Sequence, residues 1–118
     1  MTLINTVLGM AIDTKNRRPV LNTNVGGFSG PAILPIAVAN IWKVRRALPE
    51  TQILGIGGVH DADSALQLML AGANIVGVGT ANFYNPKITM EIIKGLEEYC
   101  IKDNIENIQE IVGKVRDY

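Results

Sequence analysis

Two short apolar segments that each end in glycine, and that each lead into a helical pattern, constrain the fold more than any other feature. Residues 53–57 read Ile-Leu-Gly-Ile-Gly, and residues 75–79 read Ile-Val-Gly-Val-Gly. Neither segment alternates apolar with polar side chains, which is typical of strands that are buried on both faces of a parallel sheet. A buried strand followed by an amphipathic helix, and then repeated, predicts a chain built from βα units.

The other expected elements fit the same order. Residues 2–8 are apolar and β-branched and predict a first strand, and turn-forming residues predict a β-hairpin excursion at 11–24 before a glycine-rich loop at 25–31. Further strands are expected at residues 52–56 and 74–78, and helices at residues 31–48, 61–72, 88–96 and 105–115. The helix at 61–72 is expected to bury Ala62, Leu66, Met69 and Leu70.

The repeat predicts an α/β fold, namely the C-terminal part of a (β/α)8 TIM barrel with about three strands, their helices and a hairpin insertion. A closed barrel of this kind needs eight strands and typically about 250 residues. The sequence has 118 residues. We therefore expect residues 1–118 to form the C-terminal part of a single barrel domain that is incomplete as given.

Composition and charge limit the classes of partner and the cellular compartment that fit this protein. Eleven basic and eleven acidic side chains give a formal net charge of zero, which does not favour nucleic acid or an anionic membrane as a partner. The single cysteine, Cys100, cannot form a disulfide within the chain, which fits a reducing compartment. No apolar stretch approaches the ~18 residues of a membrane span, and no secretory signal is evident. A cytoplasmic protein is expected.

Glycines at the ends of two consecutive strands indicate a phosphate site. Gly57-Gly58 and Gly79-Thr80 let the backbone approach a phosphate oxygen, and the main-chain N–H groups that follow a strand are free to donate to it. In (β/α)8 barrels such loops commonly bind phosphate. Each pair alone would fit an ordinary turn. Their occurrence on successive strands favours phosphate binding.

Two further segments could contribute to a ligand site. The third glycine-rich segment, residues 26–31, could help to cradle a flavin mononucleotide (FMN), or could be only the hairpin exit into a helix. The Asn5 amide both donates and accepts, so Asn5-Thr6 suits a planar ligand with carbonyl and N–H groups, although from these residues alone a satisfied strand-end pair is the favoured interpretation. His60 fits a surface loop and Cys100 a half-buried position. No catalytic residue and no metal site are predicted in this sequence.

The order and spacing of these motifs resemble the C-terminal part of dihydroorotate dehydrogenases. The matching segments are Ile4-Asn5-Thr6, Gly9-Met10, Ile12-Asp13, Gly26–Ile33, Gly55–Gly58, Ala71-Gly72-Ala73 and Val78–Phe83. Asn5-Thr6 and residues 79–83 most resemble the cytosolic class. The NAD-linked members of that class pair with an electron-transfer subunit that carries FAD and an iron–sulfur cluster.

The resemblance implies an oxidoreductase with FMN as its cofactor, a flavoprotein that oxidises dihydroorotate to orotate in pyrimidine (UMP) biosynthesis. It implies three sets of ligand-binding residues: Gly57, Gly58, Gly79 and Thr80 for the FMN phosphate, Ile4 and Gly30 for the rest of the flavin, and Asn5 and Thr6 for the pyrimidine ring of the substrate. Residues 1–118 would then be part of one FMN-binding domain.

The catalytic machinery of the family is only partly represented. In dihydroorotate dehydrogenases a cysteine base and a lysine near the flavin precede the segment that matches here, so the chain alone is expected to be inactive. Its expected partners are an N-terminal barrel half or a second copy of itself, and in the complete enzyme an electron-transfer subunit. Two alternatives stay open: another FMN- or phosphate-binding TIM-barrel enzyme, and a non-catalytic half-barrel that self-associates through its open sheet edges.

Overall fold

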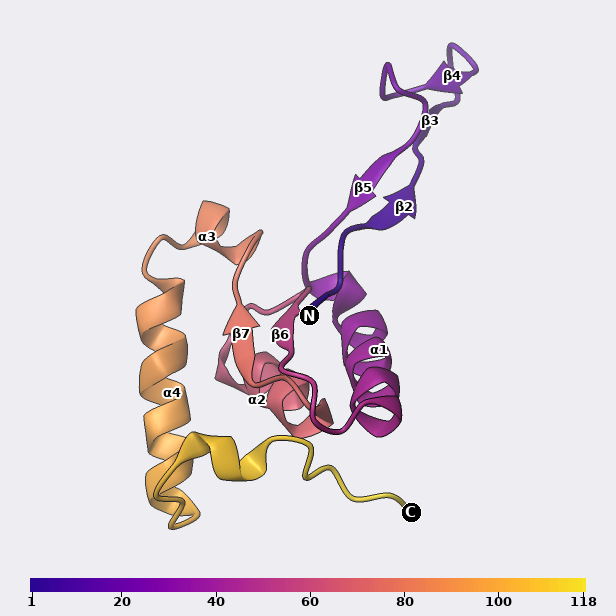
Figure 1. The fold of residues 1–118 in the computed structure, drawn as a ribbon. Coiled ribbons are helices and arrows are strands. Elements are labelled where there is room, and N and C mark those ends of the chain that lie inside the picture. Colours follow the sequence, from indigo (N-terminus) through magenta and orange to yellow (C-terminus); the bar gives the residue numbers. More distant parts are fainter.

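A three-stranded parallel sheet organises the body of the molecule in the computed structural model, which describes all residues from 1 to 118 (Figure 1). Its strands are β1 (Thr2–Leu3), β6 (Leu54–Ile56) and β7 (Ile75–Gly77), in the order β1-β6-β7. Thr2 pairs with Leu54, and Leu54 pairs in turn with Ile75. The expected parallel sheet is confirmed, and all three strands end at the same edge.

The helices that follow the strands pack side by side and cover the sheet. They are α1 (Leu34–Ala47), which continues the short 3-10 turn η1 (Pro31–Ile33), then α2 (Ala62–Ala71) and α4 (Ile88–Lys102). Ile41 of α1 and Leu68 of α2 are completely buried between these helices and the sheet. A Cβ on Gly55 would lie 3.0 Å from the Cδ1 atom of Ile41, so this glycine lets the helix close on the central strand.

Helix α2 begins at a capping box formed by Asp61 and Ser64. The Asp61 carboxylate accepts a hydrogen bond from the main-chain N–H of Ser64 at 2.8 Å, and the Ser64 hydroxyl lies 3.0 Å from the main-chain N–H of Asp61. Two N–H groups at the helix start are therefore satisfied. Gly72 ends the helix, and its φ of 137° is one that residues with side chains rarely adopt.

Replacing Asp61 by alanine should lower the free energy of unfolding by about 1 kcal/mol at neutral pH, because the cap is lost. The hydrogen bond from the Ser64 N–H, with its side chain, holds the pKa of Asp61 below its usual value. A lowered folded-state pKa stabilises the fold above the unfolded pKa of about 4, and this contribution disappears as the pH falls through the folded value. Urea unfolding at pH 7 and pH 3 should therefore show a smaller difference between wild type and Asp61→Ala at pH 3. Asp63→Ala is the control, because Asp63 accepts only from the Gln67 side chain.

The buried face of α2 differs from the predicted one. Five residues are buried, which are Ser64, Ala65, Leu68, Met69 and Ala71. Of the expected face only Met69 is among them, and Leu66 and Leu70 are half-buried. The buried face is centred on Ala65 and Leu68 instead, so the prediction placed the helix face about one position away around the helix.

The segment expected to form one strand, residues 2–8, belongs instead to two sheets. After β1, the main-chain N–H of Ile4 still donates to the carbonyl oxygen of Ile56 at 2.8 Å, and the chain then leaves the parallel sheet. The Asn5 side chain accepts from the main-chain N–H of Thr6 at 2.7 Å, so this N–H is satisfied without a neighbouring strand. The next strand, β2 (Val7–Gly9), pairs antiparallel with β5 (Gly26–Phe28). Half of the expected glycine-rich loop is therefore also a strand.

Residues 7–28 form an arm that projects from the body (Figure 1). Beyond β2 and β5 the arm continues as the hairpin of β3 (Ile12–Asp13) and β4 (Arg18–Pro19), which confirms the predicted hairpin excursion. Asp13 shapes the turn, because its Oδ1 atom accepts from the main-chain N–H groups of Lys15 and Asn16 at 3.0 and 3.2 Å. Both ends of the arm join the body beside the carboxyl end of the sheet.

The prediction of a helix at residues 105–115 is wrong. Only the 3-10 turn η2 (Ile108–Ile111) forms, because Asn107 caps it at one end and Gly113, with a φ of 71°, turns the chain at the other. The tail then runs along the end of α2, where Gly113 N–H donates to the Met69 carbonyl at 3.0 Å. No helix combines the length and the apolar character that crossing a bilayer requires.

Candidate functional site

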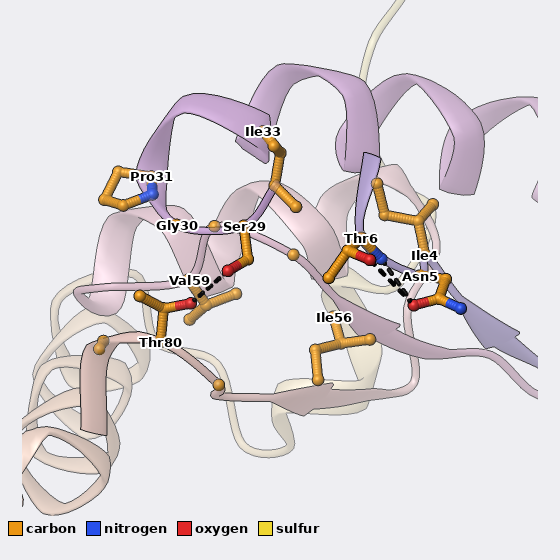
Figure 2. A pocket seen from close by; sticks show the side chains of 14 residues that line it. Ile4, Asn5, Thr6, Ser29, Gly30, Pro31, Ile33, Ile56, Val59 and Thr80 are labelled. Carbon is orange, nitrogen blue, oxygen red and sulfur yellow. Dashed lines mark hydrogen bonds between the residues drawn. The ribbon is translucent and has the colours of Figure 1, made fainter. Parts of the chain in front are cut away.

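A cavity of about 270 Å³ lies where the parallel strands end and where the arm joins the body (Figure 2). Fourteen residues from four segments line it, residues 4–6, 29–33 without Ala32, 56–59 and 79–81. All eight residues predicted from the sequence to bind ligand are among them: Ile4, Asn5, Thr6, Gly30, Gly57, Gly58, Gly79 and Thr80. The structure thus brings the three predicted sets together around one cavity.

The corner after β6 is fixed against the start of α1. Gly57 and Gly58 have φ values of 136° and 77°, which favour glycine. A Cβ on Gly58 would lie 2.7 Å from the main-chain nitrogen of Leu34 and 2.8 Å from its Cα atom. The main chain of the corner therefore touches the main chain of the helix, and a side chain at Gly58 would separate them.

At the corner after β7, no protein atom occupies the space that a side chain on Gly79 would enter. A Cβ on Gly79 would have no other atom within 4 Å. The chain then enters α3 (Ala81–Tyr84), a short helix that the sequence analysis did not predict. Gly79 therefore leaves free space at the cavity wall.

Four main-chain donors at these two corners have no partner within the protein. The N–H groups of Gly57, Gly58, Gly79 and Thr80 donate to no main-chain or side-chain acceptor. The four residues follow adjacent parallel strands, β6 and β7, and line the same cavity. Unpaired amides beside an open cavity are suited to an anion with several acceptor oxygens. The residues present therefore fit a phosphate group.

A hydroxyl pair joins the arm to the second corner. The Thr80 hydroxyl donates to the Ser29 hydroxyl at 3.0 Å, and both side chains line the cavity (Figure 2). Ser29 and Pro31 belong to the glycine-rich segment 26–31, although the sequence analysis gave neither an individual role. Four further lining residues were missed, which are Ile33, Ile56, Val59 and Ala81. Most of these are apolar and read as core positions in the sequence.

Asn5 and Thr6 lie at the other end of the cavity from Ser29 and Thr80 (Figure 2). The Asn5 Oδ1 atom accepts from the Thr6 main chain at 2.7 Å and lies 3.4 Å from the Thr6 hydroxyl. The Asn5 amide nitrogen has no protein acceptor. Both residues are exposed, so this end offers an amide donor and a hydroxyl to a polar ligand.

The cavity contains no proton-transfer group of this chain, since none of its fourteen lining residues is titratable. His60 is exposed outside it, with Nδ1 2.7 Å from the Gly58 carbonyl oxygen and Nε2 3.6 Å from the Asp61 carboxylate. Cys100 is half-buried on α4, in a separate groove with Leu96. No three His, Cys, Asp or Glu residues are grouped so as to hold a metal ion. The site can bind and orient a ligand with amides and hydroxyls.

Comparison with known proteins identifies relatives along nearly the whole chain. The sequence model of the family "Dihydroorotate dehydrogenase" matches residues 1–100. Catalytic subunits of dihydroorotate dehydrogenase B (NAD(+)) from Alkaliphilus oremlandii and Desulforamulus reducens are each 50% identical, over 98% and 96% of this chain. The one from Thermodesulfovibrio yellowstonii is 44% identical over 99%. The chain spans 37% to 38% of the length of these relatives.

Among solved structures, a dihydroorotate dehydrogenase from Eimeria tenella, crystallised in complex with ferulenol, has a similar fold. The TM-score is 0.79 at 20% sequence identity, and the match covers 96% of this chain and 30% of that chain. The likeness confirms the predicted fold class, a partial α/β barrel with a parallel sheet.

Proposed function

The chain belongs to the dihydroorotate dehydrogenase family, and on that premise we propose that it supplies the FMN-phosphate site and part of the substrate site of an FMN-dependent dihydroorotate dehydrogenase. One observation carries the proposal. Four residues whose main-chain N–H groups have no protein acceptor, from two successive βα corners, line one cavity together with Asn5 and Thr6.

In this proposal the two ends of the cavity have separate roles. Gly57, Gly58, Gly79 and Thr80 hold the phosphate through their N–H groups and the Thr80 hydroxyl. Ile4 and Gly30 contact the remainder of the flavin. When bound, FMN supplies the capacity to accept a hydride from the substrate.

Asn5 and Thr6 orient the substrate. A pyrimidine ring with carbonyl and N–H groups at its edge can accept from the Asn5 amide nitrogen and exchange a hydrogen bond with the Thr6 hydroxyl. Both groups are neutral, so they bind and orient the ring without removing a proton from it.

The proton must be taken by a group that this cavity does not contain. A general base is typically worth 10²–10⁴-fold in rate, and none of the lining residues can act as one. We therefore propose that the chain alone does not oxidise dihydroorotate, and that a polypeptide corresponding to the N-terminal barrel half completes the site. Because its relatives are named catalytic subunits, we also propose that a further electron-transfer subunit binds the complete enzyme. The proposed role of that enzyme is in cytoplasmic pyrimidine biosynthesis.

The test is a titration of FMN and then orotate into the protein, with and without an N-terminal half from the Alkaliphilus oremlandii relative. Quenching of flavin fluorescence reports FMN binding, and a shift of the flavin spectrum reports orotate. We expect both signals in the complemented protein, and bleaching of the flavin by dihydroorotate only there. FMN binding without any response to orotate would indicate another FMN-binding barrel enzyme.

One observation favours a second candidate, a non-catalytic half-barrel that self-associates. Strands β1 and β7 each have only one neighbour, so each presents an unpaired edge. The arm also exposes large apolar side chains, with Leu8 at 76% and Ile12 at 59% of full exposure. A stable oligomer in sedimentation that binds no FMN would support this candidate over the enzyme.

A further inference from the structure

We propose that Gly27, which lies outside the cavity, is a positioning residue that fixes the substrate end of the site through Thr6. The inference deepens the proposed function and rests on it, because Thr6 has a role in substrate binding only there. Gly27 belongs to β5 in the arm and pairs with Leu8. It contributes nothing to the cavity lining.

The contact between Gly27 and Thr6 leaves no room for a side chain at position 27. A Cβ built on Gly27 would lie 2.3 Å from the Thr6 hydroxyl oxygen and 2.8 Å from the Thr6 Cβ atom. Rotation of the threonine side chain would move the oxygen but not the Cβ atom, which is bonded to the main chain. A methyl group at position 27 must therefore change the position of Thr6 relative to β5.

Displacement of Thr6 would also disturb Asn5. The main-chain N–H of Thr6 donates to Asn5 Oδ1 at 2.7 Å, and the Thr6 hydroxyl lies 3.4 Å from the same oxygen. The orientation of the Asn5 amide therefore depends on where Thr6 lies. Gly27 therefore fixes the positions of both polar groups at the proposed substrate end, the Asn5 amide and the Thr6 hydroxyl. The amides of the Gly57-Gly58 corner belong to another part of the chain, so their positions do not depend on this contact.

The experiment compares Gly27→Ala with Gly26→Ala in the FMN-loaded protein with its barrel completed. Gly26 is the adjacent residue of the same strand, and a Cβ there would meet only the Cδ1 tip of Leu21, at 2.7 Å. That flexible side chain can move away, so Gly26→Ala is the matched control. Orotate affinity is read from the orotate-dependent shift of the flavin spectrum, and FMN affinity from fluorescence quenching.

Gly27→Ala should weaken orotate binding about tenfold, the effect of one lost hydrogen bond of about 1.4 kcal/mol. FMN affinity should stay within about twofold, and the control should keep both affinities. In activity assays KM for dihydroorotate should rise more than kcat falls. In a Thr6→Gly background, which removes both the hydroxyl and the Cβ atom that the new methyl group would meet, Gly27→Ala should have little further effect.

The possible results separate the inference from the proposed function. If the wild type binds FMN and orotate and Gly27→Ala binds both equally well, only the inference is overturned. Loss of FMN and orotate together in Gly27→Ala, or the same loss of orotate affinity in the Thr6→Gly background, would show a general structural role and also overturn it. A wild-type protein that binds FMN but not orotate would overturn the proposed function and, with it, the inference.

Discussion

Gly58→Ala is expected to lower the free energy of unfolding by about 3 kcal/mol, the largest effect on stability among the residues of the site. Two costs add up. Gly58 has a φ of 77°, where a residue with a side chain is disfavoured by roughly 1–2 kcal/mol. Its new Cβ would also lie 2.7 Å from the main-chain nitrogen of Leu34, and forced overpacking typically costs about 1–3 kcal/mol.

Urea unfolding followed by circular dichroism measures this effect. Gly79→Ala is the matched control, because Gly79 ends the equivalent corner and a Cβ there has no neighbour within 4 Å. We expect the control to stay within about 0.5 kcal/mol of the wild type. Equal stability of Gly58→Ala and Gly79→Ala would show that the main chain of the corner is not held against α1 as described.

Gly79→Val is expected to weaken FMN binding about 100-fold while changing stability by no more than about 1 kcal/mol. The valine side chain enters free space at the cavity wall, so the protein fold can accept it. In the proposed function this space admits the phosphate. Loss of two hydrogen bonds to a charged group, each worth about 1.5 kcal/mol, accounts for the size of the effect.

The measurement is a fluorescence titration of FMN, with the urea midpoint recorded on the same protein. Riboflavin, which lacks the phosphate, is the matched control ligand. The ratio of FMN to riboflavin affinity should collapse in Gly79→Val, because only the phosphate meets the new side chain. Unchanged FMN affinity would place the phosphate elsewhere and remove the main support for the flavin site.

The βα corners could be predicted because their signals are local. An apolar run that ends at Gly57 or Gly79 identifies a buried strand and its turn within a few residues. Since parallel strands end at one edge, their glycines were expected to converge, and the cavity contains all of them. An aspartate as the N-cap of α2 is an equally local signal, and the structure shows that Asp61 is this residue.

The errors arose where distant contacts decide the structure. Residues 2–8 carry a continuous β pattern, but the chain changes sheets at Asn5, because β1 pairs with β6 and β2 pairs with β5. Ser29 belongs to the site because it meets Thr80, which is 51 residues away in sequence. The helix expected near the C-terminus failed because Gly113 turns the tail toward α2. Periodicity within a window contains none of this information.

The order of strands in the sheet has a consequence for how the protein folds. Strand β6 pairs with β7 from about twenty residues away, whereas β1 must return to β6 from about fifty residues away, and the closure of longer loops slows folding. The β6–α2–β7 unit can therefore form as an early nucleus. Residues 4–6 close the cavity only when the chain start docks on β6. The ligand site is thus completed late. A bound ligand would contact both residues 4–6 and the β6–α2–β7 unit, and it would therefore stabilise the docked position of the chain start.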